Sequence, residues 1–201
     1  EALGAEINGV QAGSGGNGCF SFYPTKNITT CEGGMLTLNS LSEYDKAKAL
    51  AAHGVSKAAI DRERSAEQRK WYREAIYNGR NFRMPNPLAA LGYSQLRRNE
   101  SFNLSRNLIA KKYNNYIDAK DGVERQAKPG NAFHSYQMYS ILVEDKDATI
   151  NFLNRHGVMA SSHFDPPLHK QKAFEKITSG GLPNTEHISR TVVTLPIYPD
   201  M

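Results

Sequence analysis

One lysine on a short turn between two strand-like segments most constrains what this chain can fold into. Phe20 and Phe22 alternate with polar residues before the turn, and residues 35–38 are mostly apolar after it. This pattern is typical of two strands joined by a loop. Pro24 restricts the backbone two residues before Lys26, so the turn holds the lysine amine in one place. Lys26 is therefore a candidate Schiff-base residue, with a solvated loop lysine as the alternative.

Length and composition indicate a globular protein of one large domain or two small ones. The chain has 201 residues, of which 39% are hydrophobic, and this is enough to bury a core. No apolar run reaches the roughly 18 residues that a membrane helix needs. The net charge is +5, and acidic residues alternate with basic ones in the densest cluster, residues 62–74. That alternation is typical of a solvated face, so we expect neither a membrane nor nucleic acid as a partner.

The cysteines and histidines argue against a disulfide framework and against a metal site. Cys19 and Cys31 have neither zinc-binding nor redox spacing, so a reducing cytoplasm is the expected compartment. His163 and His169 flank Asp165, but this spacing matches no standard zinc pattern. We therefore expect no metal.

Capping signals predict two helices in the first half of the chain. Ser40 followed by Glu43 forms a capping box, and Gly54 can end the helix that it starts. Asn86 followed by Pro87 predicts the start of a long helix, interrupted near residue 100 and ending at about residue 117. Residues 58–72 also have a helical composition.

The last third of the chain alternates between strand-like and helix-like segments. The pattern predicts strands at 134–143 and 158–164 and helices at 147–156 and 185–193. Such alternation indicates an α/β or α+β domain.

Five short blocks occur in one order along the chain. The first is Ser-Phe-Tyr-Pro-Thr-Lys-Asn at 21–27 followed by Thr-Thr-Cys-Glu-Gly-Gly at 29–34, and the second is Gly-Arg-Asn-Phe-Arg-Met at 79–84 with Ala-Ala-Leu-Gly at 89–92 and Gln-Leu at 95–96. The other three are His-Ser-Tyr at 134–136, His-Phe-Asp-Pro-Pro-Leu-His at 163–169, and Leu-Pro-Ile-Tyr-Pro at 195–199. Together they resemble the DegT/StrS family of pyridoxal-phosphate-dependent aminotransferases, which act mostly on keto sugars.

The resemblance implies an α/β fold and an incomplete chain. We expect the second half of the large domain of a fold-type-I, aspartate-aminotransferase-like transferase, together with most of the α/β small domain. Residues 1–95 would belong to the large, cofactor-binding domain and residues 96–201 to the small domain, with the family's final helix missing. The family's first half would precede Glu1.

The resemblance also implies roles for individual residues. Lys26 would be the catalytic lysine that carries the cofactor pyridoxal 5'-phosphate, and Ser21 and Asn81 would bind the cofactor phosphate. Five residues would line the substrate site: Tyr23, His134, Tyr136, His163 and His169. Cys31 stands where the family usually has glycine, which brings the geometry of that turn into question because cysteine adopts positive φ poorly.

The expected activity is transfer of an amino group, from glutamate, to a keto sugar nucleotide in amino-sugar or polysaccharide biosynthesis. In the family, two subunits share their active sites, so the resemblance implies a homodimer. We expect the enzyme to act in the cytoplasm on small-molecule substrates. In the family, the carboxylate that holds the pyridinium proton and the ring that stacks on the cofactor lie upstream of Glu1. We therefore expect the 201-residue chain alone to be inactive.

Three alternatives remain open within and beyond the resemblance. Cyclitol aminotransferases and sugar dehydratases belong to the same family, but the dehydratases carry histidine in place of Lys26. A non-catalytic member acting as a sensor or interaction protein would have lost the lysine or a phosphate ligand. A cysteine- or metal-dependent hydrolase lacks a coherent set of nucleophile and base.

Overall fold

The computed structural model describes residues 1–55, 71–174 and 180–201. The chain divides into two compact units. Unit 1 comprises residues 1–9 and 98–201, and unit 2 comprises residues 10–97. The assignment of residues 1–95 to a large domain and 96–201 to a small domain stays a prediction.

Unit 2 contains the lysine turn and the helices on either side of it in sequence. Its strands are β2 (Val10–Gln11), β3 (Gly18–Ser21) and β4 (Gly34–Thr37), and its helices are α1 (Leu41–Ala51) and α3 (Asn86–Leu96). β3 and β4 pair antiparallel with Ser21 opposite Gly34, as the alternating pattern predicts. Most of the predicted helical segment 58–72 lies outside the described residues.

Helix starts in unit 2 follow the local capping signals. Ser40 is the N-cap of α1, and its hydroxyl accepts a hydrogen bond from the backbone N–H of Glu43 at 3.4 Å, which confirms that side of the predicted capping box. α3 begins one residue earlier than predicted. Pro85 is its N-cap, and Pro87 lies in its first turn, where a missing N–H costs little.

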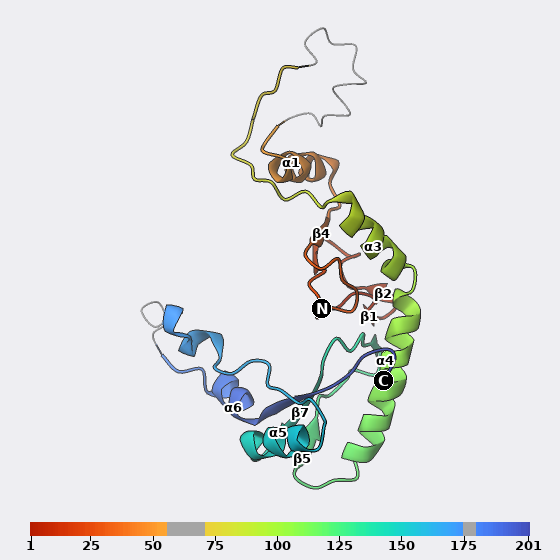
Figure 1. The fold of residues 1–201 in the computed structure, drawn as a ribbon, viewed down its shortest axis with the longest axis vertical. Coiled ribbons are helices and arrows are strands. Elements are labelled where there is room, and N and C mark those ends of the chain that lie inside the picture. Colours follow the sequence, from red (N-terminus) through yellow and green to blue (C-terminus); the bar gives the residue numbers. More distant parts are fainter. Residues whose placement is uncertain (56–70, 175–179) are drawn as a thin grey trace. The chain divides into compact units, whose positions relative to one another are not determined.

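Unit 1 is built around a three-stranded antiparallel sheet of β5 (Val123–Arg125), β7 (Tyr139–Val143) and β8 (Val192–Leu195), in the order β5-β7-β8. Figure 1 shows the sheet with the helices of the unit around it: α4 (Asn99–Ile117), α5 (Lys146–Arg155) and α6 (Pro183–Thr191). Short helices η1 (Leu168–Lys170) and η2 (Lys172–Phe174) follow α5. β1 (Glu6–Ile7) pairs antiparallel with β6 (Ala132–Phe133).

The core of unit 1 lies between its sheet and α4. Alternate residues of β7 point inward, so that Tyr139, Ile141 and Val143 are buried while the residues between them are half-buried. They pack with the fully buried Val193 of β8 and with Ala110 of α4. Burial therefore holds the centre of the sheet in a fixed register, with Ile141 opposite Val193.

The long helix breaks at residues 97–98 into α3 and α4 and ends at Ile117, which confirms the predicted interruption near residue 100. Three of the other predicted elements differ from the structure. The strand predicted at 134–143 is confined to β7 and preceded by a loop in which Tyr136 has a φ of +43°, an angle that extended strands do not contain. Residues 158–164 contribute one bridge, between Ser161 and Thr194. The predicted helix at 185–193 ends at Thr191, and the chain continues directly as β8.

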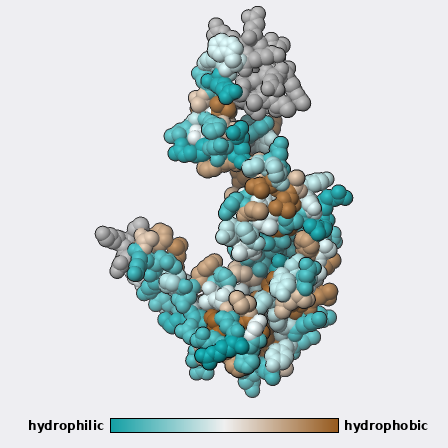
Figure 2. All heavy atoms as spheres, in the orientation of Figure 1, coloured by the Kyte–Doolittle hydropathy of each residue, from teal (hydrophilic) through white to brown (hydrophobic). Residues whose placement is uncertain are grey.

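The surface carries several large apolar side chains. The face shown in Figure 2 is mostly hydrophilic, with apolar groups scattered over it. In unit 2, Leu41, Trp71 and Phe82 are 74–76% exposed. Across the described part of the chain, no helix has the length and apolar character needed to cross a membrane.

Candidate active site

Backbone hydrogen bonds close the neck of the loop that carries Lys26. The N–H of Phe22 donates to the carbonyl of Gly33 at 3.0 Å, and the N–H of Thr30 donates to the carbonyl of Phe22 at 2.9 Å. Within the loop, the N–H of Lys26 donates to the carbonyl of Tyr23 at 3.0 Å. Phe22 at the neck of the loop and Ile28 within it are buried. The loop is therefore an ordered platform on which the predicted Schiff-base lysine has a defined backbone position.

Helix α3 binds the same loop through one side-chain amide. The Oε1 atom of Gln95 accepts a hydrogen bond from the N–H of Thr29 at 3.1 Å, and its Nε2 donates to the carbonyl of the same residue at 2.7 Å. Gln95 thus satisfies both backbone groups of a residue three positions after Lys26, as a neighbouring strand would. This contact gives a physical reason for the glutamine in the second resembling block.

A glycine allows α3 to lie close to the loop. A Cβ atom placed on Gly92 would lie 2.6 Å from the side-chain Cγ2 of Thr30, which is too close for any real contact. Thr30 is itself 1% exposed, and its hydroxyl donates to the carbonyl of Glu32 at 2.8 Å. Gly92 and Gln95, one helical turn apart, therefore dock α3 on the segment that follows the lysine.

The other predicted residues of unit 2 lie on two different segments. Ser21 is the last residue of β3, and its Oγ accepts a hydrogen bond from the N–H of Tyr23 at 3.4 Å. Both residues therefore lie at the start of the loop that carries Lys26. Asn81 pairs with Ala52 after α1, and its Oδ1 accepts from Nε of Arg83 at 3.3 Å. Ser21, Tyr23 and Lys26 thus lie at the connection from β3 to β4, whereas Asn81 lies on a separate exposed segment.

In unit 1, His134 and Tyr136 form a tight pair before β7. Their ring centroids are 4.4 Å apart, and the N–H of Tyr136 donates to Nδ1 of His134 at 2.8 Å. This bond places the proton of the neutral imidazole on Nε2. Burial, assisted by the charge of Lys128, lowers the pKa of His134. His134 therefore presents an N–H donor near neutral pH, which suits a sugar hydroxyl or carbonyl.

His163 lies on the connection from α5 to η1, whereas His169 lies within η1, and the two have different surroundings. Nδ1 of His163 lies 3.0 Å from the hydroxyl of Thr194 on β8. His169 is nearly buried, and its Nε2 lies 3.2 Å from Oε1 of Glu186 on α6. This hydrogen bond is the main cause that lowers the pKa of Glu186. His169 thus fastens the loop to α6 through Nε2.

His163 also borders a pocket of about 440 Å³ in unit 1. Its wall includes apolar groups of Phe164, Leu168 and Ile188, with Ser189 as a polar member. A concave, mostly apolar surface with a few polar groups is typical of a small-molecule site. No set of three or more possible metal ligands was found among residues 1–55, 71–174 and 180–201.

Residues that the sequence interpretation missed hold these loops in place. Gln95 belongs to the second resembling block, but no role was assigned to it. Its spacing of one helical turn from Gly92 could have indicated that both residues face the same neighbouring segment. Lys146 was missed as well, although it follows the capping residue Asp145 at the start of α5 and is 7% exposed. A lysine at that position reads as a solvated residue in sequence, and its burial results from long-range packing.

Replacing Cys31 with glycine is expected to stabilise the protein by about 0.5–1 kcal/mol. Cys31 has a φ of +64°, a conformation that costs a non-glycine residue about 1–2 kcal/mol, while glycine adds an entropic cost of about 0.5–1 kcal/mol. Urea unfolding measures the difference. The matched control is Cys19→Gly in β3, where the same change should destabilise, and equal effects at the two positions would contradict the interpretation.

The ion pair of Lys146 and Asp165 predicts a contribution to stability that disappears in acid. The hydrogen bond from Lys146 lowers the pKa of Asp165. A carboxyl group with a lowered pKa stabilises the folded state fully above its unfolded value of about 4, and the contribution is lost as pH falls through the lowered value. The difference in urea midpoint between wild type and Asp165→Asn should therefore be largest at pH 6 and shrink toward pH 2.5. A difference independent of pH would contradict the ion pair.

Comparison with known proteins places the chain in one family. A model of the DegT/DnrJ/EryC1/StrS aminotransferase family matches residues 1–201. An uncharacterised protein of Methanocaldococcus jannaschii is 34% identical over 210 residues, which is 100% of this chain and 54% of that protein. The spore coat polysaccharide biosynthesis protein SpsC of Bacillus subtilis is 32% identical over 192 residues, covering 90% of this chain and 49% of SpsC.

A solved structure shows the same fold. The aminotransferase TlmJ from Streptoalloteichus hindustanus matches with a TM-score of 0.85 and 26% identity, over 98% of this chain and 51% of that one. The likeness confirms the predicted α/β fold, and the chain spans about half the length of the relatives that it matches. Because the family model covers every residue, the chain belongs to the DegT/DnrJ/EryC1/StrS aminotransferase family.

Proposed function

We propose that the protein containing this chain is a pyridoxal-phosphate-dependent aminotransferase that transfers an amino group from glutamate to a keto sugar carried on a nucleotide. The observation that carries the proposal is Lys26 on an ordered loop that α3 braces through Gln95, in a chain of an aminotransferase family. The relative SpsC, described as a polysaccharide biosynthesis protein, supports an amino-sugar product.

The donor groups of the loop that carries Lys26 fit this cofactor. Lys26 supplies a primary amine that can hold an aldehyde carbon, and Ser21 supplies a hydroxyl whose hydrogen is not used in its bond with Tyr23. Asn81 would add an amide N–H donor for the phosphate. When bound, pyridoxal phosphate stabilises negative charge on the substrate carbon. Lys26 would then act as the base that moves the proton from that carbon.

Five side chains would bind the substrate. Tyr23 lies in the loop that carries Lys26, and the other four residues belong to unit 1: His134, Tyr136, His163 and His169. The pocket beside His163 supports a role in binding, because it combines apolar walls with polar groups. The N–H of the neutral His134 would orient a sugar oxygen.

A homodimer with shared active sites would complete this proposal. Exposed apolar side chains in unit 2, among them Trp71 and Phe82, are typical of surfaces that a partner covers. Asn81, next to Phe82, would then reach the cofactor of the other subunit. Residues 1–95 and 96–201 would contribute to the large and small domains, and the enzyme would act in the cytoplasm.

Borohydride trapping of the full-length protein tests the function. The protein is reduced in the presence of pyridoxal phosphate, digested, and the labelled peptide is mapped by mass spectrometry. We expect the label on Lys26, with the buried Lys146 as an unlabelled internal control. Labelling of another lysine would exclude the assigned role. A panel of UDP- and dTDP-linked keto sugars with glutamate then identifies the acceptor by amino-sugar formation.

A further inference from the structure

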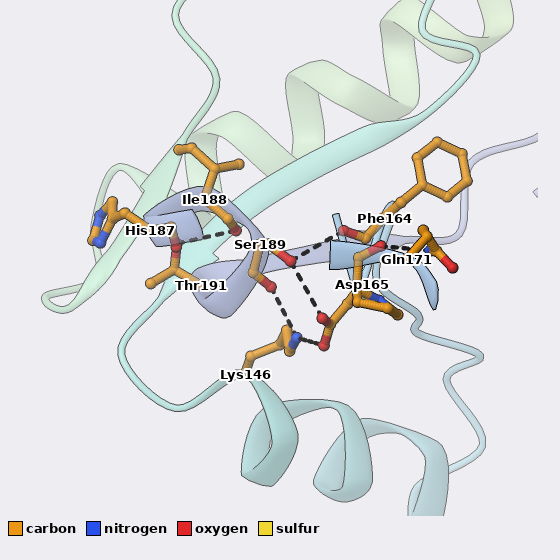
Figure 3. A network of polar contacts seen from close by, with 9 residues as sticks. Lys146, Phe164, Asp165, Gln171, His187, Ile188, Ser189 and Thr191 are labelled. Carbon is orange, nitrogen blue, oxygen red and sulfur yellow. Dashed lines mark hydrogen bonds and ion pairs between the residues drawn. The ribbon is translucent and has the colours of Figure 1, made fainter. Parts of the chain in front are cut away.

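A buried lysine in unit 1 connects the loop at 163–169 to two helices, as Figure 3 shows. Lys146 lies in the first turn of α5, and its side chain is 7% exposed. Its Nζ donates to the backbone carbonyl of Ser189 on α6 at 2.8 Å and to Oδ2 of Asp165 in the loop. We call Lys146, Asp165 and Ser189 the Lys146 cluster.

Ser189 closes the cluster on its other side. It is 5% exposed, and its hydroxyl lies 3.1 Å from the carbonyl of Phe164 and 3.3 Å from Oδ1 of Asp165. The single hydroxyl hydrogen of Ser189 is shared between these two acceptors, so Ser189 links Oδ1 of Asp165 and the backbone of the preceding residue to α6. Because a buried ammonium group requires its partners, these bonds leave the loop one favoured position between α5 and α6.

The cluster shares one residue, Ser189, with the wall of the pocket. His163, Phe164 and Ser189 line the pocket, and Phe164 and Ser189 are joined by the hydrogen bond of the cluster. A shift of Asp165 would consequently move His163, two residues away, and change the shape of the pocket. The position of the predicted substrate-binding histidine thus depends on residues that do not themselves belong to the predicted site.

Charge gives the cluster a second effect. Asp165 is half-exposed, so without Lys146 it would present an unbalanced negative charge beside the pocket. A nucleotide sugar carries a diphosphate, and an unpaired carboxylate near its binding site would repel it. Lys146 neutralises that carboxylate while leaving the loop in place.

We infer that the Lys146 cluster positions the loop at 163–169 for binding of the anionic sugar substrate, with Lys146 as a positioning residue. The inference rests on the proposed function, because it assigns the pocket beside His163 to the keto sugar nucleotide. It adds residues that act through the loop and touch neither cofactor nor reacting atoms.

Kinetics of the full-length enzyme separate this role from a general loss of structure. In Lys146→Met we expect the KM for the keto sugar nucleotide to rise at least about tenfold, equivalent to about 1.4 kcal/mol, with kcat reduced less than KM rises. The half-reaction with glutamate, followed by absorbance without sugar, should stay within about twofold of wild type, because its substrate lacks the diphosphate. Lys146→Arg should restore most of the affinity.

A double variant and a surface control sharpen the test. Lys146→Met/Asp165→Asn removes both charges and should have a lower KM than Lys146→Met alone, since the repelling carboxylate is gone. Lys112→Met, an exposed position on α4, should match wild type. An unchanged KM in Lys146→Met, or equal losses in both half-reactions, would overturn the inference.

Hydrogen exchange provides a readout that needs no activity. Amides of residues 161–169 should exchange at least about tenfold faster in Lys146→Met than in wild type, while those of β7 and β8 stay protected. Unchanged exchange in the loop would refute the positioning role. If wild type transfers no amino group to any sugar nucleotide, the proposed function fails, and the exchange experiment still decides whether the cluster holds the loop.

Discussion

Replacing Lys26 with alanine is expected to lower the rate of amino transfer by about 10⁴-fold, because one amine serves both to hold the cofactor and to move the proton. The rate of a single turnover with glutamate, followed by cofactor absorbance, measures the loss. Lys111→Ala, an exposed lysine of α4, is the matched control and should retain full activity.

The Lys26→Ala variant should fold normally. The loop is held by the backbone bond from Lys26 N–H to the Tyr23 carbonyl and by those around Phe22, none of which needs the lysine side chain. Its far-UV circular dichroism spectrum should therefore match that of wild type. Added methylamine should restore part of the activity by supplying the missing amine. Full activity without an added amine would exclude Lys26 as the catalytic lysine.

Replacing Gln95 with leucine is expected to destabilise the protein by about 2–4 kcal/mol. The change leaves the N–H and the carbonyl of Thr29 without their side-chain partner, and each partly buried group costs about 1–3 kcal/mol when unsatisfied. Urea unfolding measures the free energy. Because Thr29 lies three residues after Lys26, we also expect slower amino transfer in the folded variant.

Gln95→Glu provides a graded comparison. A carboxylate can still accept from the N–H of Thr29 but cannot donate to its carbonyl, so this variant should fall between wild type and Gln95→Leu. Ser94→Ala, an exposed neighbour on α3, should unfold like wild type. If Gln95→Leu were as stable as Ser94→Ala, the two hydrogen bonds would have no role in holding the loop.

Elements with local signals were predictable from sequence. The strand pair around the lysine, the N-cap Ser40 and helix α5 all follow from alternation, capping and apolar spacing over a few residues. The strained turn at Cys31 was also foreseeable, since its resembling block usually has glycine there, and the structure gives it a φ of +64°.

Elements defined by distant pairing were not predictable. β8 follows α6 without a turn, and its residues become a strand because Val193 pairs with Ile141 in the middle of the sheet. The segment 158–164 was also predicted to be a strand, yet its pairing amounts to the bridge between Ser161 and Thr194. Strand propensity depends on whether a partner strand is available, and a single sequence does not contain that information.

The family, the fold class and the residues for which roles are proposed can all be read from the sequence, because the motif blocks and the local periodicity lie along the chain. How those residues are held depends on contacts between distant segments. Gln95 reaches Thr29 across 66 positions, and Lys146 reaches Asp165 across 19 and Ser189 across 43. Such contacts form when burial removes water from polar groups and makes each one require a partner, which is a property of the folded chain.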